Sequence, residues 1–242
     1  AAIAAVAGVA SAQEQVVKIG HVAPVSGAQA HYGKDNENGA RMAIEELNAQ
    51  GVTIGGKKIK FELVGEDDQA DPRTGTTVAQ RLVDAGVKGV IGHLNSGTSI
   101  PASRIYDQAG IPQVSPASTN PKLTLQNFSG VFRTIANDVQ QGTGLGKYAT
   151  GALGAKRVAI IDDRTAYGQG LADETAKAVK ETGGEVVARE FTTDKATDFN
   201  AILTKIRATN PEVIFYGGMD AQAGPMVRQM KQLGITAKFL TG

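Results

Sequence analysis

Residues 157–191 read RVAIIDDRTAYGQGLADETAKAVKETGGEVVAREF, and this stretch decides the fold. Its first six residues, 157–162, are a short and largely aliphatic run, which is typical of a buried strand. Residues 167–181 have the pattern of a helix, and residues 185–191 form a second strand-like segment. A strand, a helix and another strand in this order predict a crossover unit with two parallel strands.

The same alternation continues on both sides of this stretch. We expect strands at residues 16–22, 58–64, 88–94 and 111–115, and helices at 36–50, 72–85 and 98–108. Residues 128–135 interrupt the pattern. A second series then adds helices at 138–153, 198–208 and 223–233 and strands at 213–216 and 239–241. Two such series predict an α/β protein with two Rossmann-like lobes, at residues 13–136 and 137–242, each built on a parallel sheet.

The composition excludes several classes of function. The chain has 25 Lys and Arg residues against 24 Asp and Glu, so it offers no electrostatic basis for binding nucleic acid. It contains no cysteine, which excludes disulfides, thiolate metal sites and a Cys nucleophile in these residues. Its three histidines lack the spacing of a metal site. We therefore expect no metal and no cofactor.

The first twelve residues differ from the rest. Residues 1–12 read AAIAAVAGVASA, are uncharged and small, and end in Ala10-Ser11-Ala12 before a polar segment. This pattern is typical of the end of a secretory signal peptide, so we expect a signal-peptide remnant and an exported protein. The alternative is a helix of small residues in the mature fold.

Three motifs that resemble functional sites have simpler structural explanations. Residues 142–147 (GTGLGK) lack the spacing of a phosphate loop, so close helix packing on small residues is the better interpretation. The acidic residues 65–71 lack the spacing of a calcium loop and predict a solvated turn in which Asp71 caps a helix. His93, in an apolar strand, is expected to be a hydrogen-bonded core residue.

Polar turns follow two of the predicted strands, where ligands of open parallel sheets bind. In the first turn, Ser96 and the free amides of Gly97 and Thr98 open a helix and suit a carboxylate. In the second, the carbonyl of Ala117 and the hydroxyl of Thr119 are acceptors that suit an ammonium group. Together the turns would fit a zwitterion; the alternative is two ordinary turns.

Eight short motifs occur in register from about residue 16 to residue 242 and resemble those of the leucine/isoleucine/valine-binding protein family. They are residues 25–27, 32–33, 92–94, 101–103, 115–119, 132–134, 167–170 and 216–218. The resemblance implies a type I periplasmic-binding fold, a Venus-flytrap receptor with a hinge between its lobes. It further implies a monomeric, non-catalytic periplasmic protein that binds a branched-chain amino acid and delivers it to the membrane permease subunits of an ABC importer.

The resemblance also implies roles for single residues. The hydroxyl and amide of Ser96 and the amide of Thr119 would hold the ligand carboxylate, and Ala117 and the Thr119 hydroxyl would hold its ammonium group. The ligand side chain would be bordered by residues of both lobes: Tyr32, Leu94, Asn95 and Ser118 from the first, and Tyr167 and Met219 from the second.

Some positions depart from the family pattern. The family places a tyrosine where Met219 stands and a disulfide where Ala70 and Asn95 stand. Its acidic ammonium partner and the segments that return to the first lobe would lie after Gly242, so we expect a chain truncated at the C-terminus. Two other functions stay open: an exported sensor of the same fold that binds an amide, urea or another amino acid, and an exported hydrolase. The hydrolase would need an activated nucleophile, yet Ser96 has no evident His–Asp partner.

Overall fold

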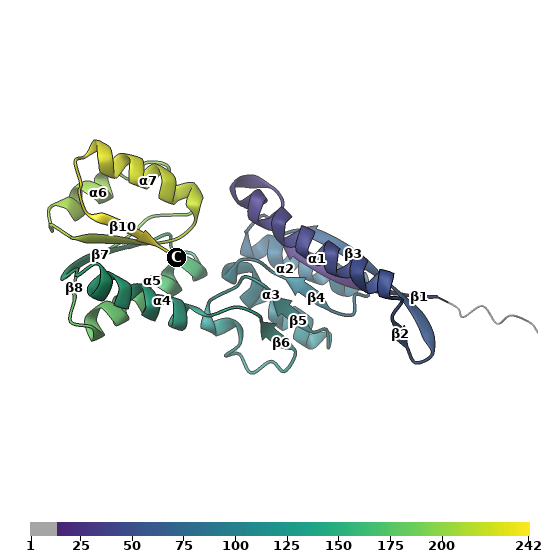
Figure 1. The fold of residues 1–242 in the computed structure, drawn as a ribbon. Helices are drawn as coiled ribbons and strands as arrows, with labels where there is room; N and C mark the ends of the chain where they lie inside the picture. Colours follow the sequence, from purple (N-terminus) through teal and green to yellow (C-terminus); the bar gives the residue numbers. More distant parts are fainter. Residues whose placement is uncertain (1–13) are drawn as a thin grey trace, which may run out of the picture.

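Two α/β lobes lie side by side in the structure, a computed structural model that describes residues 14–242 (Figure 1). The first lobe contains a six-stranded sheet of order β2-β3-β1-β4-β5-β6, and the second a four-stranded sheet of order β10-β9-β7-β8. All neighbouring strands are parallel except the antiparallel pair β2 and β3. The predicted fold class is thus confirmed, while the expected signal-peptide remnant at residues 1–12 lies outside the described residues.

The first lobe has helices on both faces of its sheet. Its elements are β1 (Gln15–Ala23), α1 (Ala30–Gln50), β2 (Thr53–Ile54), β3 (Lys57–Asp67), α2 (Pro72–Asp84), β4 (Val90–Gly92), α3 (Ser96–Gln108), β5 (Gln113–Ser115) and β6 (Val131–Arg133). Helices α2 and α3 cover one face, with Val78, Leu82 and Tyr106 fully buried against the strands. Helix α1 covers β1 and β3 on the other face.

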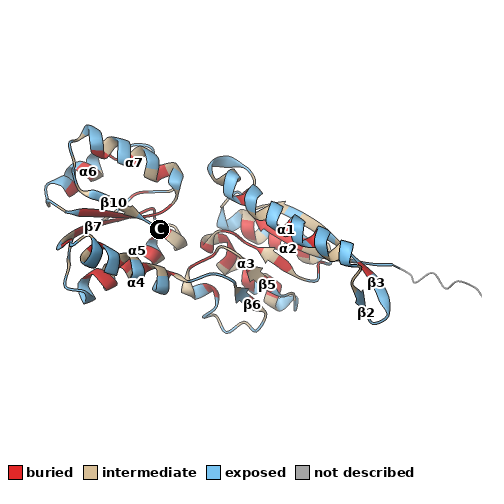
Figure 2. Ribbon diagram, viewed as in Figure 1, coloured by how far each residue is buried: buried red, intermediate tan, exposed pale blue. Residues whose placement is uncertain are grey.

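The second lobe places its sheet between two helix pairs. Its elements are α4 (Asp138–Lys147), a π-helical turn (Tyr148–Ala152), β7 (Arg157–Asp162), α5 (Ala166–Glu181), β8 (Glu185–Phe191), α6 (Asn200–Arg207), β9 (Val213–Gly217), α7 (Asp220–Gln232) and β10 (Lys238–Thr241). The residues of β9 and most of β7 are buried (Figure 2). One core packs the sheet on α4 and α5, and another packs it on α6 and α7.

The start of helix α1 differs from the prediction. The helix begins at Ala30, six residues before the expected start at residue 36, because a 3₁₀ turn at Gly27–Gln29 leads directly into it. Its first turn packs closely on the end of β1: a Cβ at Gly33 would lie 2.0 Å from the carbonyl oxygen of Pro24. The close packing therefore requires glycine at this position.

The interruption expected at residues 128–135 contains strand β6, which extends the sheet of the first lobe at its edge. Residues 134–137 then connect β6 to α4, so the chain passes from one lobe to the other there. Across residues 14–242, no helix is long and apolar enough to cross a membrane.

Two structural interpretations of motifs are confirmed. The side chain of Asp71 accepts a hydrogen bond from the Thr74 amide at 2.8 Å, with Pro72 at the first position of α2. Gly142 and Gly146 allow α4 to approach α5: a Cβ at Gly146 would lie 2.5 Å from the Cβ of Ala178.

The acidic turn is less solvated than the sequence predicts. Asp68 is completely buried and pairs with His93, so the expectation of a wholly solvated turn is wrong at this residue. The sequence pattern missed this pairing because the two residues are 25 positions apart.

Candidate functional site

A pocket of about 290 Å³ lies between the two lobes, at the carboxyl ends of their strands. Both lobes contribute to its wall, which is lined by Tyr32, Asp35, Asn36, Leu94, Asn95, Ser96, Ala117, Thr119, Gln141, Tyr167, Met219 and Gly242. Eight of the nine residues proposed from the sequence to border a ligand are therefore brought together; their contact with a ligand stays a prediction.

The first helix turn of α3 forms one side of the pocket. Asn95 precedes the helix but does not cap it; its side-chain amide donates to Gln29 Oε1 at 2.7 Å. The sequence suggested a free amide at Thr98, and this expectation is wrong. The Thr98 amide donates to the Asn95 carbonyl at 3.2 Å. The amides at the start of the helix, at Ser96 and Gly97, are the ones that a ligand can use.

The hydroxyl of Ser96 is oriented by its neighbour in the next turn. Its oxygen accepts a hydrogen bond from the Asn120 amide at 3.2 Å. A serine hydroxyl carries one hydrogen and two lone pairs, so the O–H remains available as a donor. Ser96 is almost fully buried, and its free donor suits an acceptor such as a carboxylate oxygen.

The hydroxyl of Thr119 lacks a hydrogen-bond partner among the described residues, although the oxygen is buried. Buried polar atoms in folded proteins nearly always have a partner, so this one points to a group that is bound there. The neighbouring Ala117 also lines the pocket. The two turns therefore offer a donor at Ser96 and an unused hydroxyl at Thr119 within one cavity.

Ser118 occupies a different position from the one expected. Its side chain is fully buried and does not line the pocket. Its hydroxyl bonds to the Ser99 hydroxyl and to the Leu94 carbonyl, the latter at 3.0 Å. The hydroxyl is thus engaged outside the cavity, and the contact of Ser118 with a ligand stays a prediction. The residue supports the turn from behind.

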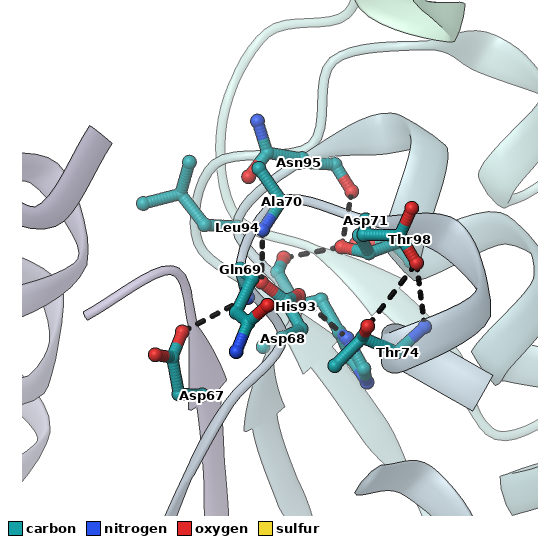
Figure 3. Close-up of polar contacts among 12 residues, drawn as sticks. Asp67, Asp68, Gln69, Ala70, Asp71, Thr74, His93, Leu94, Asn95 and Thr98 are labelled. Carbon is teal, nitrogen blue, oxygen red and sulfur yellow. Dashed lines mark hydrogen bonds and ion pairs between the residues drawn. The ribbon is translucent and has the colours of Figure 1, made fainter. Parts of the chain in front are cut away.

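His93 connects the first turn with the acidic loop behind it (Figure 3). Its Nδ1 lies 3.0 Å from Asp68 Oδ2, and its Nε2 lies 3.0 Å from the Tyr106 hydroxyl. Its main-chain oxygen accepts from the hydroxyls of Ser99 and Ser115, at 2.9 Å and 2.8 Å. The expectation of a hydrogen-bonded core histidine is confirmed.

Tyr167 is the main contribution of the second lobe to the wall. It lies in the first turn of α5, whose N-cap Thr165 accepts from the Gly168 amide at 3.0 Å. Burial, with a smaller effect of the nearby Asp138 carboxylate, raises the pKa of Tyr167 to about 12. The phenol therefore stays neutral at physiological pH and can donate a hydrogen bond.

Three polar lining residues were missed by the sequence reasoning: Asp35, Asn36 and Gln141. The signal for the first two was present, because they follow Tyr32 by three and four positions and so share its helix face. Gln141 follows Asp138 by one turn of α4. Among the described residues that line the wall, Asp35 has the one carboxylate side chain, and none is Lys, Arg or His.

This charge pattern limits the chemistry of a ligand. A dicarboxylate would meet no cationic side chain in the wall to offset its charge. Over the part of the chain that the structure describes, no group of three or more His, Asp and Glu side chains is placed to hold a metal ion. The arrangement can bind a small polar group through hydroxyls and amides.

Comparison with known proteins agrees with this geometry. The profile of the family described as "Periplasmic binding protein" matches residues 16–242. The chain is 44% identical over 241 residues to an "Amino acid binding protein" of Pseudomonas aeruginosa, covering 99% of this chain and 64% of that protein. It is 42% identical over 226 residues to "Leu/Ile/Val-binding protein homolog 1" of Brucella abortus, covering 93% of this chain and 60% of that protein.

Solved structures of amino-acid-binding proteins have a similar fold. A branched-chain amino acid transporter substrate-binding protein, LivJ of Streptococcus pneumoniae in complex with isoleucine, superposes with a TM-score of 0.82 at 31% identity. That match covers 94% of this chain and 64% of the other. The leucine-binding protein LivK of Thermotoga maritima superposes with a TM-score of 0.85 at 31% identity, covering 93% and 63%. The chain spans less than two thirds of the length of these relatives, and it belongs to the periplasmic binding protein family.

Proposed function

We propose that this protein binds a free amino acid with a branched aliphatic side chain in the pocket between its lobes. The proposal depends on one observation: the Ser96 hydroxyl, which can donate, and the Thr119 hydroxyl, which has no partner among the described residues, line the same pocket. The carboxylate of a zwitterion would accept from Ser96, and its ammonium group would donate to Thr119. Such a ligand needs no cationic side chain in the wall. Leu94 and Met219 supply apolar surface for the ligand side chain.

The names of similar proteins support this choice of ligand. The Brucella relatives are Leu/Ile/Val-binding protein homologues, and the Streptococcus structure contains isoleucine. We infer that the protein acts in the periplasm as the receptor of an ABC importer, binds its ligand without turnover and delivers it to the permease subunits.

Ligand binding would be coupled to closure of the lobes. Residues 13–136 and 137–242 would move as units about the connection at residues 134–137. A ligand that contacts Ser96 in one lobe and Tyr167 in the other favours the closed arrangement, because both contacts form only there.

Calorimetry with leucine tests the site. We expect Ser96→Ala and Thr119→Ala each to weaken binding by roughly ten- to a hundredfold, because each removes a hydrogen bond to a charged ligand group. Ser103→Ala is a matched control, since its hydroxyl bonds to the Ile100 carbonyl within α3, away from the pocket. Unchanged affinity in both site variants would contradict the proposal.

A ligand panel separates the alternatives. Leucine, valine, phenylalanine, short amides and urea would be compared on the same protein. Preference for an amide or urea would favour the sensor, and recovery of a chemically altered ligand would favour the hydrolase.

A further inference from the structure

One ion pair joins the two lobes in the part of the chain that the structure describes. His31, in the first turn of α1, places its Nε2 3.2 Å from Oδ2 of Asp220, the first residue of α7. The other ion pairs of residues 14–242 each lie within one lobe. The start of α1 faces α7 of the second lobe (Figure 1). The contact therefore forms only when the lobes approach each other.

Asp220 is oriented by its own helix. Its Oδ1 accepts a hydrogen bond from the Ala221 amide at 2.9 Å, which leaves Oδ2 for the partner on the other lobe. A carboxylate in the first turn of a helix is also favoured by the helix dipole. The negative side of the contact is thus held in place without help from the first lobe.

Tyr32 connects the ion pair with the ligand pocket. Its ring lies against that of His31, with the centroids 4.0 Å apart, and its side chain is part of the pocket wall. Burial raises the pKa of Tyr32, and the charge of Asp220 and its hydrogen bond with the phenol raise it further. The phenol therefore stays neutral and keeps its proton for Asp220. One side chain of the wall thus contacts both members of the pair.

The cation of this pair is a side chain that changes its charge near neutral pH. Imidazole groups titrate between about pH 5 and 8. A neutral imidazole carries a hydrogen on only one of its two nitrogens, whereas the protonated ring carries both and adds Coulomb attraction to a carboxylate. Within one turn of His31 on α1 the other charged residues are Lys34 and Asp35, and Lys and Asp side chains do not ordinarily titrate in this range.

We propose that His31 and Asp220 form a pH-dependent latch between the lobes: protonation of the His31 imidazole strengthens the contact with Asp220 and stabilises the closed, ligand-bound arrangement. This inference rests on the proposed function. The proton comes from solvent, because the two side chains are 55% and 54% exposed. Closure favours the protonated imidazole, so ligand affinity rises as pH falls through the range in which imidazole titrates.

Leucine affinity, measured by calorimetry from about pH 7.5 to about pH 5.5, tests the latch. Leucine remains a zwitterion throughout, so the ligand contributes no titration. We expect the ratio of wild-type to His31→Gln affinity to increase by up to about fivefold over this range, as for an exposed pair. Glutamine keeps a hydrogen-bond donor but does not titrate. The ratio also cancels the contribution of Asp138, whose pKa is raised by burial to about 6.

Asp220→Asn is the second variant, because it removes the charge that the protonated imidazole meets. It should reduce the pH dependence as much as His31→Gln does, and the double variant should reduce it no further. Asp198→Asn is the matched control. Asp198 is an exposed aspartate before α6, and its carboxylate accepts from the Asn200 amide at 2.9 Å within the second lobe. This variant should keep the pH dependence of the wild type.

Proton uptake gives a readout that is independent of affinity. Calorimetry at about pH 6.5, in two buffers with different ionisation enthalpies, measures the number of protons that the protein takes up when leucine binds. We expect the wild type to take up more protons than His31→Gln, because closure favours the protonated imidazole. A contact that only holds the lobes together would leave the uptake equal in the two proteins.

Each result distinguishes this inference from the proposed function. Equal pH dependence or equal proton uptake in wild type and His31→Gln would overturn the latch and leave the amino-acid site standing. Loss of the pH dependence in Asp198→Asn would also overturn it, because the effect would not be specific to the contact between the lobes. Failure of the wild type to bind leucine at any pH would overturn the proposed function, and the latch with it.

Discussion

The side chain of Asp68 joins two parts of the first lobe. One carboxylate oxygen accepts from the Ala70 amide and the other contacts His93 Nδ1, both at 3.0 Å. These contacts attach the loop after β3 to the end of β4. They lie near Ala70 and Asn95, the two positions at which the leucine/isoleucine/valine-binding protein family has a disulfide. In this chain the connection between the loop and the pocket turn is polar.

Removal of the Asp68 carboxylate should destabilise the first lobe. We expect Asp68→Ala to lower its free energy of unfolding by about 3 kcal/mol, because His93 Nδ1 and the Ala70 amide would be buried without an acceptor. Urea unfolding followed by circular dichroism measures the change. Asp84→Ala is the control, since Asp84 bonds only to the exposed Gln80 and should change stability by less than about 0.5 kcal/mol. Equal stability of both variants would contradict a structural role for the pair.

Single residues of the site were predicted unevenly from the sequence. Ser96 and Thr119 could be placed because both follow predicted strands, where ligand sites of parallel sheets occur. The inward direction of Ser118 could not, because it depends on hydrogen bonds to Ser99 and Leu94 in a neighbouring segment. The burial of Asp138 could not be predicted either, since it follows from packing against α5.

Among the elements, α4 and α5 form a close pair in the second lobe. The glycines at positions 142 and 146 face α5, whereas Gly144, between them, has no atom within 4 Å of its potential Cβ. The same helix thus contains glycines that packing requires and one that it does not.

This contrast gives a prediction on one helix. Gly146→Ala should lower the stability of the second lobe by roughly 1–3 kcal/mol, because the added methyl group meets Ala178 and forces the helices apart. Gly144→Ala should raise stability by about 0.5–1 kcal/mol, since alanine is the better helix former at an open position. Thermal unfolding of the two variants in parallel checks the signs. Destabilisation of both by the same amount would refute the packing role.

Strands and helices whose apolar residues recur with a clear period could be predicted from the sequence, and elements without such a period could not. The helix expected at residues 72–85 agrees with α2 within one residue, because Asp71 and Pro72 mark its start. The two-residue strand β2 is too short for a sequence pattern, and β6 owes its place to pairing with β5. Tertiary pairing decides such short segments, so local sequence alone does not identify them.

At the scale of the whole molecule, two polar contacts join the lobes on either side of the pocket. At the hinge, the Asn120 side-chain amide donates to the Ala166 carbonyl at 2.7 Å. At the mouth, His31 on α1 lies 3.2 Å from the Asp220 carboxylate at the start of α7. Burial and the same carboxylate raise the pKa of the adjacent Tyr32. The second contact forms only when the lobes are close.

The contact at the mouth should slow ligand release. Asp220→Asn should increase the dissociation rate of leucine by up to about fivefold, the range expected for an exposed polar contact worth about 0.2–1 kcal/mol. Stopped-flow fluorescence with a competing ligand measures the rate. The control is Glu185→Gln, which breaks an exposed pair with Arg157 inside the second lobe and should leave the rate unchanged. An identical rate in wild type and Asp220→Asn would exclude this contact from ligand retention.

Asn120 connects a residue of the pocket wall, Ser96, to the second lobe. Its amide donates to Ser96, its side chain holds the second lobe at Ala166, and its carbonyl accepts from Arg133. If the protein binds its ligand as proposed, we expect this residue to link ligand affinity to the angle between the lobes, and such linkage is reciprocal. An antibody fragment selected for the closed arrangement would therefore raise the affinity of the protein for leucine without contacting the pocket. Leucine would raise the affinity of the protein for the antibody fragment by the same factor.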